Sequence, residues 1–242
     1  MEKIIEVKNF AKAFGNKKVH KDVSFEVHRG ECLGLIGGSG TGKSVLLRSL
    51  IGLEQADSGQ IFIEGQNITR LRERELIPVR KKVAYAFQGG ALFDSMTVFE
   101  NLAYPLREHT KMNERDISIK IKELLAAFGL TGDDHLYPAN LSGGMQKRLG
   151  LARAIILNPD VILYDEPTAG LDPYNTKRIA EMISQLKSMG KTGILVTHDM
   201  PVAFDVCDRI AMLVKGHVVS VGRPSEIKNN KDHPIWKFAQ GD

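Results

Sequence analysis

Apolar and polar residues alternate through much of the first ninety positions of this chain. A repeat of two residues is typical of β-strands with one buried face. A helix is expected over residues 44–53, directly after a glycine-rich turn. The rest of this part is expected to be β-structure, with strands over residues 4–14, 24–27, 32–36, 60–64 and 82–87.

The spacing of apolar residues becomes helical between residues 95 and 157. Those of segment 117–128 fall on one face of a helix, and Gly129 is placed to cap its C-terminus. Thr97 and Glu100 have the spacing of a capping box that opens another helix. This stretch is expected to form a helical insert.

Strands and helices alternate again after the insert. Apolar runs predict strands over residues 161–164, 193–197 and 210–214, and the apolar residues of segment 179–186 share one helical face. Alternation of this kind favours a parallel sheet flanked by helices. The prediction is therefore a single α/β domain over residues 1–242, with its core in residues 1–90 and 158–242 and a helical subdomain in residues 91–157.

The composition adds few constraints to this picture. The 33 Lys and Arg residues against 29 Asp and Glu leave a net charge of +4, which an ordinary solvated surface explains better than an anionic ligand or a membrane surface does. Cys32 and Cys207 lack metal-ligand spacing and are expected to be buried free thiols of a reducing compartment. With no secretion signal and no apolar run of about 20 residues, the chain is expected to be soluble and cytoplasmic.

A phosphate-binding motif follows the predicted strand over residues 32–36. In the pattern G-x-x-x-x-G-K-[ST], glycine N–H groups surround phosphates, Lys43 reaches the terminal phosphates, and the Ser44 hydroxyl ligates Mg²⁺. The strand before the motif and the helix after it are the context that the motif requires. A plain glycine turn with an exposed lysine would not need them. The motif consists of Gly37, Gly38, Ser39, Gly40, Thr41, Gly42, Lys43 and Ser44.

Two adjacent carboxylates, Asp165 and Glu166, end the strand predicted over residues 161–164. Neighbouring side chains of a strand point to opposite sides, so the two residues can divide two tasks. Asp165 is expected to hold Mg²⁺, and Glu166 is expected to polarise the attacking water as general base. Alone, the pair would more simply be an acidic turn; beside Lys43 and Ser44, catalysis is the better interpretation.

A second anion site is predicted where Ser142 caps a helix that runs to about residue 157. The unsubstituted N–H groups of Gly143 and Gly144 lie at the first turn. One nucleotide does not need two such helix ends from one chain, so we expect this site to close over ATP held by another subunit. An ordinary capped helix start is the alternative.

These motifs and their order resemble the ATP-hydrolysing subunits of ABC transporters, and the resemblance covers essentially the whole chain. It implies an α/β P-loop NTPase core with a mostly parallel sheet, an N-terminal antiparallel β-subdomain and an inserted α-helical subdomain. It also implies a head-to-tail dimer that traps two ATP molecules between the Walker A of one copy and the signature of the other. The matching segments are residues 37–44 (Walker A), Gln88 (Q-loop), residues 141–144 (signature), residues 163–166 (Walker B), residues 170–172 (D-loop) and His198 (switch histidine).

The same resemblance assigns roles to residues that would be unremarkable alone. Gln88 would sense Mg²⁺ and the attacking water, His198 would contact the γ-phosphate, and Asp172 would link the two sites. The implied catalytic set is Glu166, His198, Gln88 and Lys43, and the implied metal set is Ser44, Gln88 and Asp165. Further nucleotide contacts are Phe14, which would stack on adenine unless it packs in the core, and Val19 and Val45.

Met145 stands where most of this family has glutamine after the two glycines. Together with the segments 87–94, 97–101 and 104–109, it resembles a narrower group, the ATPase subunits of bacterial Mla-type and Mce-associated phospholipid transporters. That likeness implies a second copy of the chain, membrane permease subunits, a lipid-binding Mce-domain protein and a small regulatory subunit as partners. It would place the chain on the inner face of the inner membrane, held there by the permease.

Other functions explain less of the sequence. A chromosome-organising or DNA-repair ABC ATPase would carry a long coiled-coil insert, and a translation-associated ABC protein usually has two cassettes. A P-loop kinase would leave Gln88, His198 and the signature without a task. No basic tract with interleaved aromatic residues supports nucleic-acid binding. Among transporters, the alternative is an importer of amino acids or other small solutes.

Overall fold

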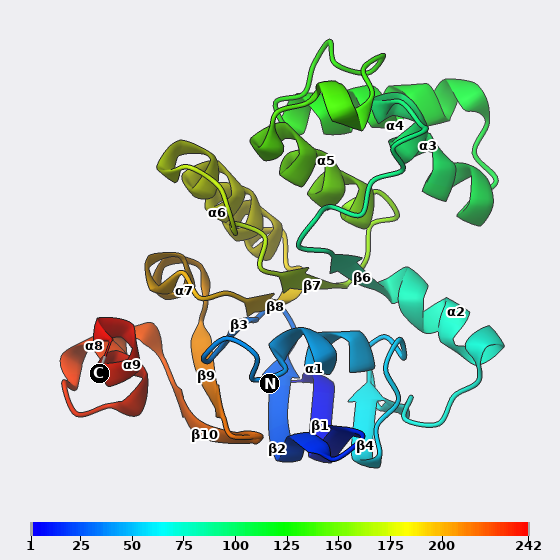
Figure 1. Cartoon of the computed structure of the whole chain (residues 1–242). Helices are drawn as coiled ribbons and strands as arrows, with labels where there is room; N and C mark the ends of the chain where they lie inside the picture. The colour runs from blue at the N-terminus through cyan, green and yellow to red at the C-terminus, as the bar shows by residue number, and fades with distance from the viewer. Residues whose placement is uncertain (1, 242) are drawn as a thin grey trace.

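A ten-stranded sheet organises residues 2–241, the part of the chain that the computed structural model describes (Figure 1). Its order is β5-β4-β1-β2-β10-β9-β3-β8-β7-β6. The run from β9 to β6 is parallel, whereas β1 pairs antiparallel with β2 and β4. The predicted fold class is thereby confirmed. The strands are β1 (Lys3–Phe14), β2 (Lys17–His28), β3 (Cys32–Ile36), β4 (Ser58–Ile63), β5 (Gln66–Asn67), β6 (Val83–Ala86), β7 (Val161–Asp165), β8 (Thr192–Val196), β9 (Arg209–Val214) and β10 (His217–Gly222).

Helices cover both faces of this sheet, and α3, α4 and α5 form a separate group beyond β6 and β7 (Figure 1). No helix within residues 2–241 combines the length and the apolar composition that crossing a membrane requires. The helices are α1 (Lys43–Ser49), α2 (Glu73–Lys82), α3 (Val98–His109), α4 (Glu114–Ala127), the 3₁₀ helix η1 (Pro138–Asn140), α5 (Gly143–Ile155), α6 (Pro173–Ser188), α7 (Met200–Val206), α8 (Pro224–Asn229) and α9 (Pro234–Gln240).

Two apolar cores lie on opposite faces of the parallel strands. On β7, Val161 and Leu163 pack into the core around α1, whereas Ile162 and Tyr164 pack into the core shared with the helices of the other face. Alternate side chains of a strand point to opposite faces, so a strand covered on both sides is apolar throughout. This burial holds β3 and β7 rigid at the ends from which the candidate site residues extend.

Local sequence signals set the helix boundaries in the helical group. The capping box of α3 is confirmed, because Glu100 N donates to Thr97 Oγ1 at 3.2 Å and Thr97 N donates to the Glu100 side chain at 2.7 Å. Gly129, with φ of 61°, follows the end of α4 in the left-handed region, as its capping prediction requires.

Several elements differ from the sequence prediction. The expectation of one helix in the first ninety residues is wrong, because α2 is also present. This helix buries only Leu76 and Val79, so its apolar residues show too little helical periodicity to predict it. The helix predicted to reach residue 53 ends at Ser49, and the strand predicted over residues 24–27 is part of the longer β2. The sequence did not predict the short elements α7, α8, α9 and β10.

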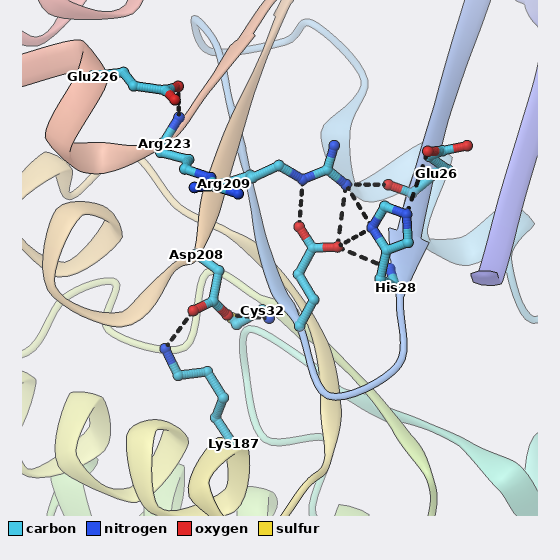
Figure 2. Close-up of polar contacts among 9 residues, drawn as sticks. Glu26, His28, Cys32, Lys187, Asp208, Arg209, Arg223 and Glu226 are labelled. Atoms are coloured by element: carbon cyan, nitrogen blue, oxygen red, sulfur yellow. Dashed lines mark hydrogen bonds and ion pairs between the residues drawn. The ribbon is translucent and has the colours of Figure 1, made fainter. Parts of the chain in front are cut away.

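A half-buried ion-pair network joins the starts of β3 and β9 to the end of β2 (Figure 2). Arg209 donates to the carboxylate of Glu31 at 2.6 and 3.1 Å and to the carbonyl of Glu26 at 2.8 Å. His28 N also donates to Glu31, at 2.8 Å. Burial by itself would raise the pKa of Glu31, but Arg209 and the His28 N–H outweigh it, so that pKa is lowered. The carboxylate is thus charged when the chain is folded.

We predict that E31Q lowers the free energy of unfolding by about 1–3 kcal/mol at neutral pH, because Arg209 loses its charged partner. The folded-state pKa of Glu31 is depressed, so this stabilisation is complete above the unfolded-state pKa of about 4.3 and is lost as the pH falls towards the folded-state value. Urea denaturation of both proteins over a pH series measures the difference. E114Q is the control, because its partner Arg107 binds in the same bidentate way on an exposed surface. An E31Q effect no larger than that of E114Q would contradict the prediction.

Candidate functional site

A cavity of about 680 Å³ lies beside the loop that joins β3 to α1. Every residue that lines it belongs to the predicted site except Lys17, which enters from the start of β2. The lining residues are Phe14, Lys17, Val19, Gly37, Ser39, Gly40, Gly42, Lys43, Ser44, Val45, Gln88, Glu166 and His198.

The glycine loop owes its shape to two positions where no side chain fits. At Gly37, with φ of 150°, a Cβ would lie 2.4 Å from the carbonyl oxygen of Leu213. At Gly42, with φ of 92°, it would lie 2.3 Å from Val19 Cγ1. The left-handed backbone and the close neighbours both require glycine here. The loop is therefore fixed by the strands beneath it.

Lys43 lies inside the loop, and its side chain is bound to the loop backbone. Its Nζ donates to the carbonyl oxygens of Gly37 at 2.8 Å and Gly38 at 3.2 Å, and Thr41 Oγ1 donates to Gly38 at 2.9 Å. Burial lowers the pKa of Lys43, although the charges of Glu166 and Asp165 oppose that shift. The ammonium group is thus poised beside the positions that phosphate oxygens would occupy.

His20 lies directly beneath Gly42 and has no counterpart among the predicted site residues. It is 1% exposed, and neither ring nitrogen has a hydrogen-bond partner among the described residues. Burial lowers its pKa to about 4. The ring is neutral near pH 7 and contributes packing, not charge, to the support of the loop.

The carboxylate of Asp165 joins three elements of the fold. Its Oδ1 accepts a 2.7 Å hydrogen bond from Ser44 Oγ at the start of α1, and its Oδ2 accepts one of 2.7 Å from the Tyr85 hydroxyl on β6. Burial and the bond to Asp165 raise the pKa of Tyr85, so its hydroxyl remains a donor. Tyr85 could have been found only from the strand pairing, which places it opposite Leu163 in the register of β6 and β7.

Ser44 and Asp165 fit the requirements of Mg²⁺ bound together with a nucleotide. This ion prefers oxygen ligands and is usually held by one or two protein groups, with phosphates and water completing its shell. The hydroxyl and the carboxylate are such a pair, whereas residues 2–241 contain no cluster of three or more His, Cys, Asp or Glu side chains that would cage a metal ion alone. Gln88 lines the same cavity and offers an amide oxygen.

Glu166 and His198 form a second polar pair at the cavity wall. Glu166 Oε2 accepts hydrogen bonds from His198 N at 3.3 Å and contacts His198 Nδ1 at 2.8 Å. The φ of Glu166 is 49°, an uncommon conformation for a residue with a side chain, and its N–H donates to the carbonyl of Val196 at 2.9 Å. β7 ends at Asp165, so this turn, and not the strand alternation used in the sequence analysis, sets the direction of the Glu166 side chain.

Helix α5 contacts the segment that carries Gln88 at three positions spaced by three residues. Lys147 Nζ donates to the carbonyl of Gln88, and Arg153 donates to that of Gly90 at 3.3 Å. Between them, a Cβ on Gly150 would lie 2.6 Å from Gly90 Cα. Gln88, which lines the cavity, is therefore in direct contact with the helix that follows Ser142. The sequence did not predict this contact of Lys147.

The predicted second anion site does not line the cavity. Ser142 caps α5, with its Oγ accepting from Met145 N at 3.3 Å, and Asp172 caps α6 by accepting from Asn175 N at 3.0 Å. The two caps are neighbours, because a Cβ on Gly144 would lie 2.3 Å from Asn175 Oδ1. Asn175 also donates to Asp172 Oδ2 at 2.6 Å. The signature and the D-loop thus form one continuous surface.

Phe14 and Met145 have environments that bear on their predicted roles. Phe14 is 45% exposed, with the Lys12 ammonium 5.0 Å from its ring centroid. It lines the cavity, which excludes core packing as the reason for an aromatic residue there. Met145 is partly buried against the apolar core of the helical side, and only its backbone N–H bonds to Ser142.

Comparison with known proteins adds family evidence to this geometry. The model of the ABC transporter family matches residues 20–169. The chain is 43% identical over 232 residues to the probable ribonucleotide transport ATP-binding protein mkl of Mycobacterium leprae, a match that covers 96% of this chain and 67% of that protein. The chain spans 64% of the length of the Mycobacterium tuberculosis protein of the same name.

The names of two other relatives refer to different substrates. The chain is 37% identical to the intermembrane phospholipid transport system ATP-binding protein MlaF of Escherichia coli, covering 98% of this chain and 89% of that protein. It is 40% identical to the methionine import ATP-binding protein MetN of Carboxydothermus hydrogenoformans, covering 97% of this chain and 70% of that protein.

Solved structures agree with these sequence matches. A dimeric post-hydrolysis structure of the ATP-binding cassette MJ0796, bound to ADP and Pi, superposes with a TM-score of 0.85 at 30% identity, covering 91% of this chain and 98% of that one. CbiO1 of Clostridium perfringens, part of the ABC transporter complex cbiONQ, gives a TM-score of 0.86 at 26% identity, covering 96% of this chain and 93% of that one.

Proposed function

The chain belongs to the ABC transporter family and is an ATPase subunit, and from this premise we propose that two copies hydrolyse ATP between them to drive a membrane permease. The observation that carries the proposal is the division of the site. The phosphate loop and Glu166 line one cavity, and Asp165 is bonded to Ser44 of that lining, while Ser142 and Asp172 lie on a surface that does not line it.

The residues of the cavity divide the work of hydrolysis among themselves. Lys43 exchanges its bonds to the loop carbonyls for the terminal phosphates of ATP. Ser44 and Asp165 would hold Mg²⁺, which would neutralise phosphate charge. Glu166, oriented by His198, accepts a proton from water as the water oxygen bonds to the γ-phosphorus and the bond from that phosphorus to ADP breaks. Gln88, which lines the same cavity, would contact the ion and the attacking water.

The second copy supplies the other half of each site. In a head-to-tail dimer, the start of α5 in one chain meets the cavity of the other, and the N–H groups of Gly143 and Gly144 and the Ser142 hydroxyl complete the cage around the γ-phosphate. ATP binding then favours the closed dimer, because each nucleotide is fully coordinated only there. Asp172 bonds to Asn175, which adjoins the signature at Gly144, so the D-loop and the signature would meet the partner together.

Two inactive variants test this shared site by complementation. K43A disables the phosphate loop, and G143D places a negative charge against the γ-phosphate; a Cβ on Gly143 meets no atom within 4 Å, so the latter variant keeps its fold. We expect each alone to be nearly inactive and an equal mixture to regain about a quarter of wild-type turnover, because random pairing makes half of the dimers mixed, each with one of two sites intact. The rate of phosphate release measures the ATP turnover of the mixture.

The controls for this mixture are K43A mixed with itself at twice the concentration and wild type diluted with G143D. A mixture no more active than its separate components, or G143D that is fully active alone, would contradict the shared site.

Movement of the helical subdomain, residues 91–157, would couple hydrolysis to the permease. An apolar groove of about 300 Å³ runs between α1, α2, β6 and α5, with Leu53, Phe87 and Leu157 on its walls. Leu53 and Phe87 are 48% and 39% exposed. We propose that the permease docks here, next to Gln88. This docking would hold the chain at the inner face of the membrane. Phe87 then reports the state of the cavity to the permease.

Phospholipid is the substrate class that we propose. It rests on the likeness to MlaF, which covers 98% of this chain and 89% of that protein, and on Met145, which packs against the core of the helical side where most of the family has glutamine. An Mce-domain protein and a small regulatory subunit would complete such a transporter. The likeness to MetN favours the second candidate, an importer of small solutes such as amino acids.

Purification of the chain with its membrane partner, followed by mass spectrometry of bound molecules, separates the two candidates. We expect phospholipid in excess of that found with an unrelated membrane protein treated in the same detergent. A complex that retains a small polar solute and no enriched phospholipid would contradict the lipid assignment and leave the ATPase assignment intact.

A further inference from the structure

The Tyr85 hydroxyl is a part of the site that the proposed function does not use. It donates a 2.7 Å hydrogen bond to Asp165 Oδ2, while Oδ1 of the same carboxylate bonds to Ser44. Tyr85 and Asp165 are 9% and 5% exposed, so water competes weakly for these bonds. Each carboxylate oxygen therefore has its own fixed partner.

The pairing of β6 with β7 creates this contact. Tyr85 stands opposite Leu163 in the parallel register, and Asp165 lies two residues further along β7, on the same face as Leu163. The Tyr85 ring therefore extends towards the carboxyl end of β7, where Asp165 is. Its ring also packs on Phe87, with centroids 4.3 Å apart, which restricts its rotation.

We propose that Tyr85 is a positioning residue for Mg²⁺ binding, whose hydroxyl holds the Asp165 carboxylate so that Oδ1 faces Ser44. The inference rests on the proposed function, because it concerns the same ATP site. An aspartate at a strand end has more than one accessible rotamer, and hydrogen-bond partners outside the ligand set select one of them. The ring of a phenylalanine would fill the same space without selecting a rotamer.

The position of Tyr85 gives this role a second consequence. Its ring borders the groove that we propose for the permease, while its hydroxyl contacts the carboxylate that we propose for Mg²⁺. One side chain thus connects the docking surface with the metal ligand. A permease that displaces Phe87 would shift the Tyr85 ring and, through it, Asp165.

Y85F tests the proposal in the full-length chain, since it removes the hydroxyl and keeps the ring. Both wild type and variant carry E166Q, so that binding is measured without turnover. Fluorescent methylanthraniloyl-ATP is titrated first in EDTA and then at increasing Mg²⁺, and Mn²⁺ binding is followed by electron paramagnetic resonance. We expect Y85F to bind the nucleotide normally in EDTA and to need about 10–100-fold more Mg²⁺ for full affinity.

Y104F is the matched control. Tyr104 lies on α3, is 42% exposed, and packs its ring on Phe93, with centroids 5.4 Å apart, outside the ATP site. We expect its Mg²⁺ dependence to equal that of wild type. If Y85F does not fold, Y85M, which fills the space with a flexible apolar side chain, takes its place in the same titration.

Three outcomes would be decisive. An unchanged Mg²⁺ dependence in Y85F would overturn the proposal, and so would an equal loss of affinity with and without Mg²⁺, which would mean that Tyr85 only supports the fold. Wild type that gains no affinity from Mg²⁺ would instead contradict the proposed function of the cavity.

Discussion

The hydrogen bonds on Asp165 are the interactions on which the rest of the site depends. They tie the start of α1, the end of β6 and the end of β7 to a single carboxylate, and two apolar cores fix those strand ends from opposite faces of the sheet. The cavity is therefore rigid where phosphate and metal ion would be held.

The segment after β6 connects this rigid centre to the helical group. Gln88 follows β6, and its carbonyl is bound by Lys147 of α5, so the cavity wall and the helical group share a contact. Burial lowers the pKa of Lys147, while the charges of Glu166 and Asp165 raise it, which places this ammonium group within the field of the catalytic carboxylates. Lys147 therefore links α5 to the cavity both through its bond to Gln88 and through charge.

The sequence predicted those parts that depend on local rules. The glycine loop, the capped start of α5 and the two carboxylates after β7 each follow from short-range spacing, and each lies where it was expected. Tyr85, Lys17, His20 and Asn175 were not predictable in the same way, because their roles come from strand register or from contacts between distant segments. Helix α2 was hidden for a related reason, since most of its residues are exposed and polar.

The dependence of assembly on hydrolysis tests the central claim most directly. The account predicts that E166Q, with Mg²⁺ and ATP, loses turnover by about 10²–10⁴-fold and doubles its mass in light scattering, whereas with ADP it stays a monomer. E181Q, an exposed glutamate on α6, should behave as wild type. An E166Q chain that turns over ATP normally, or that remains a monomer with ATP bound, would contradict the account.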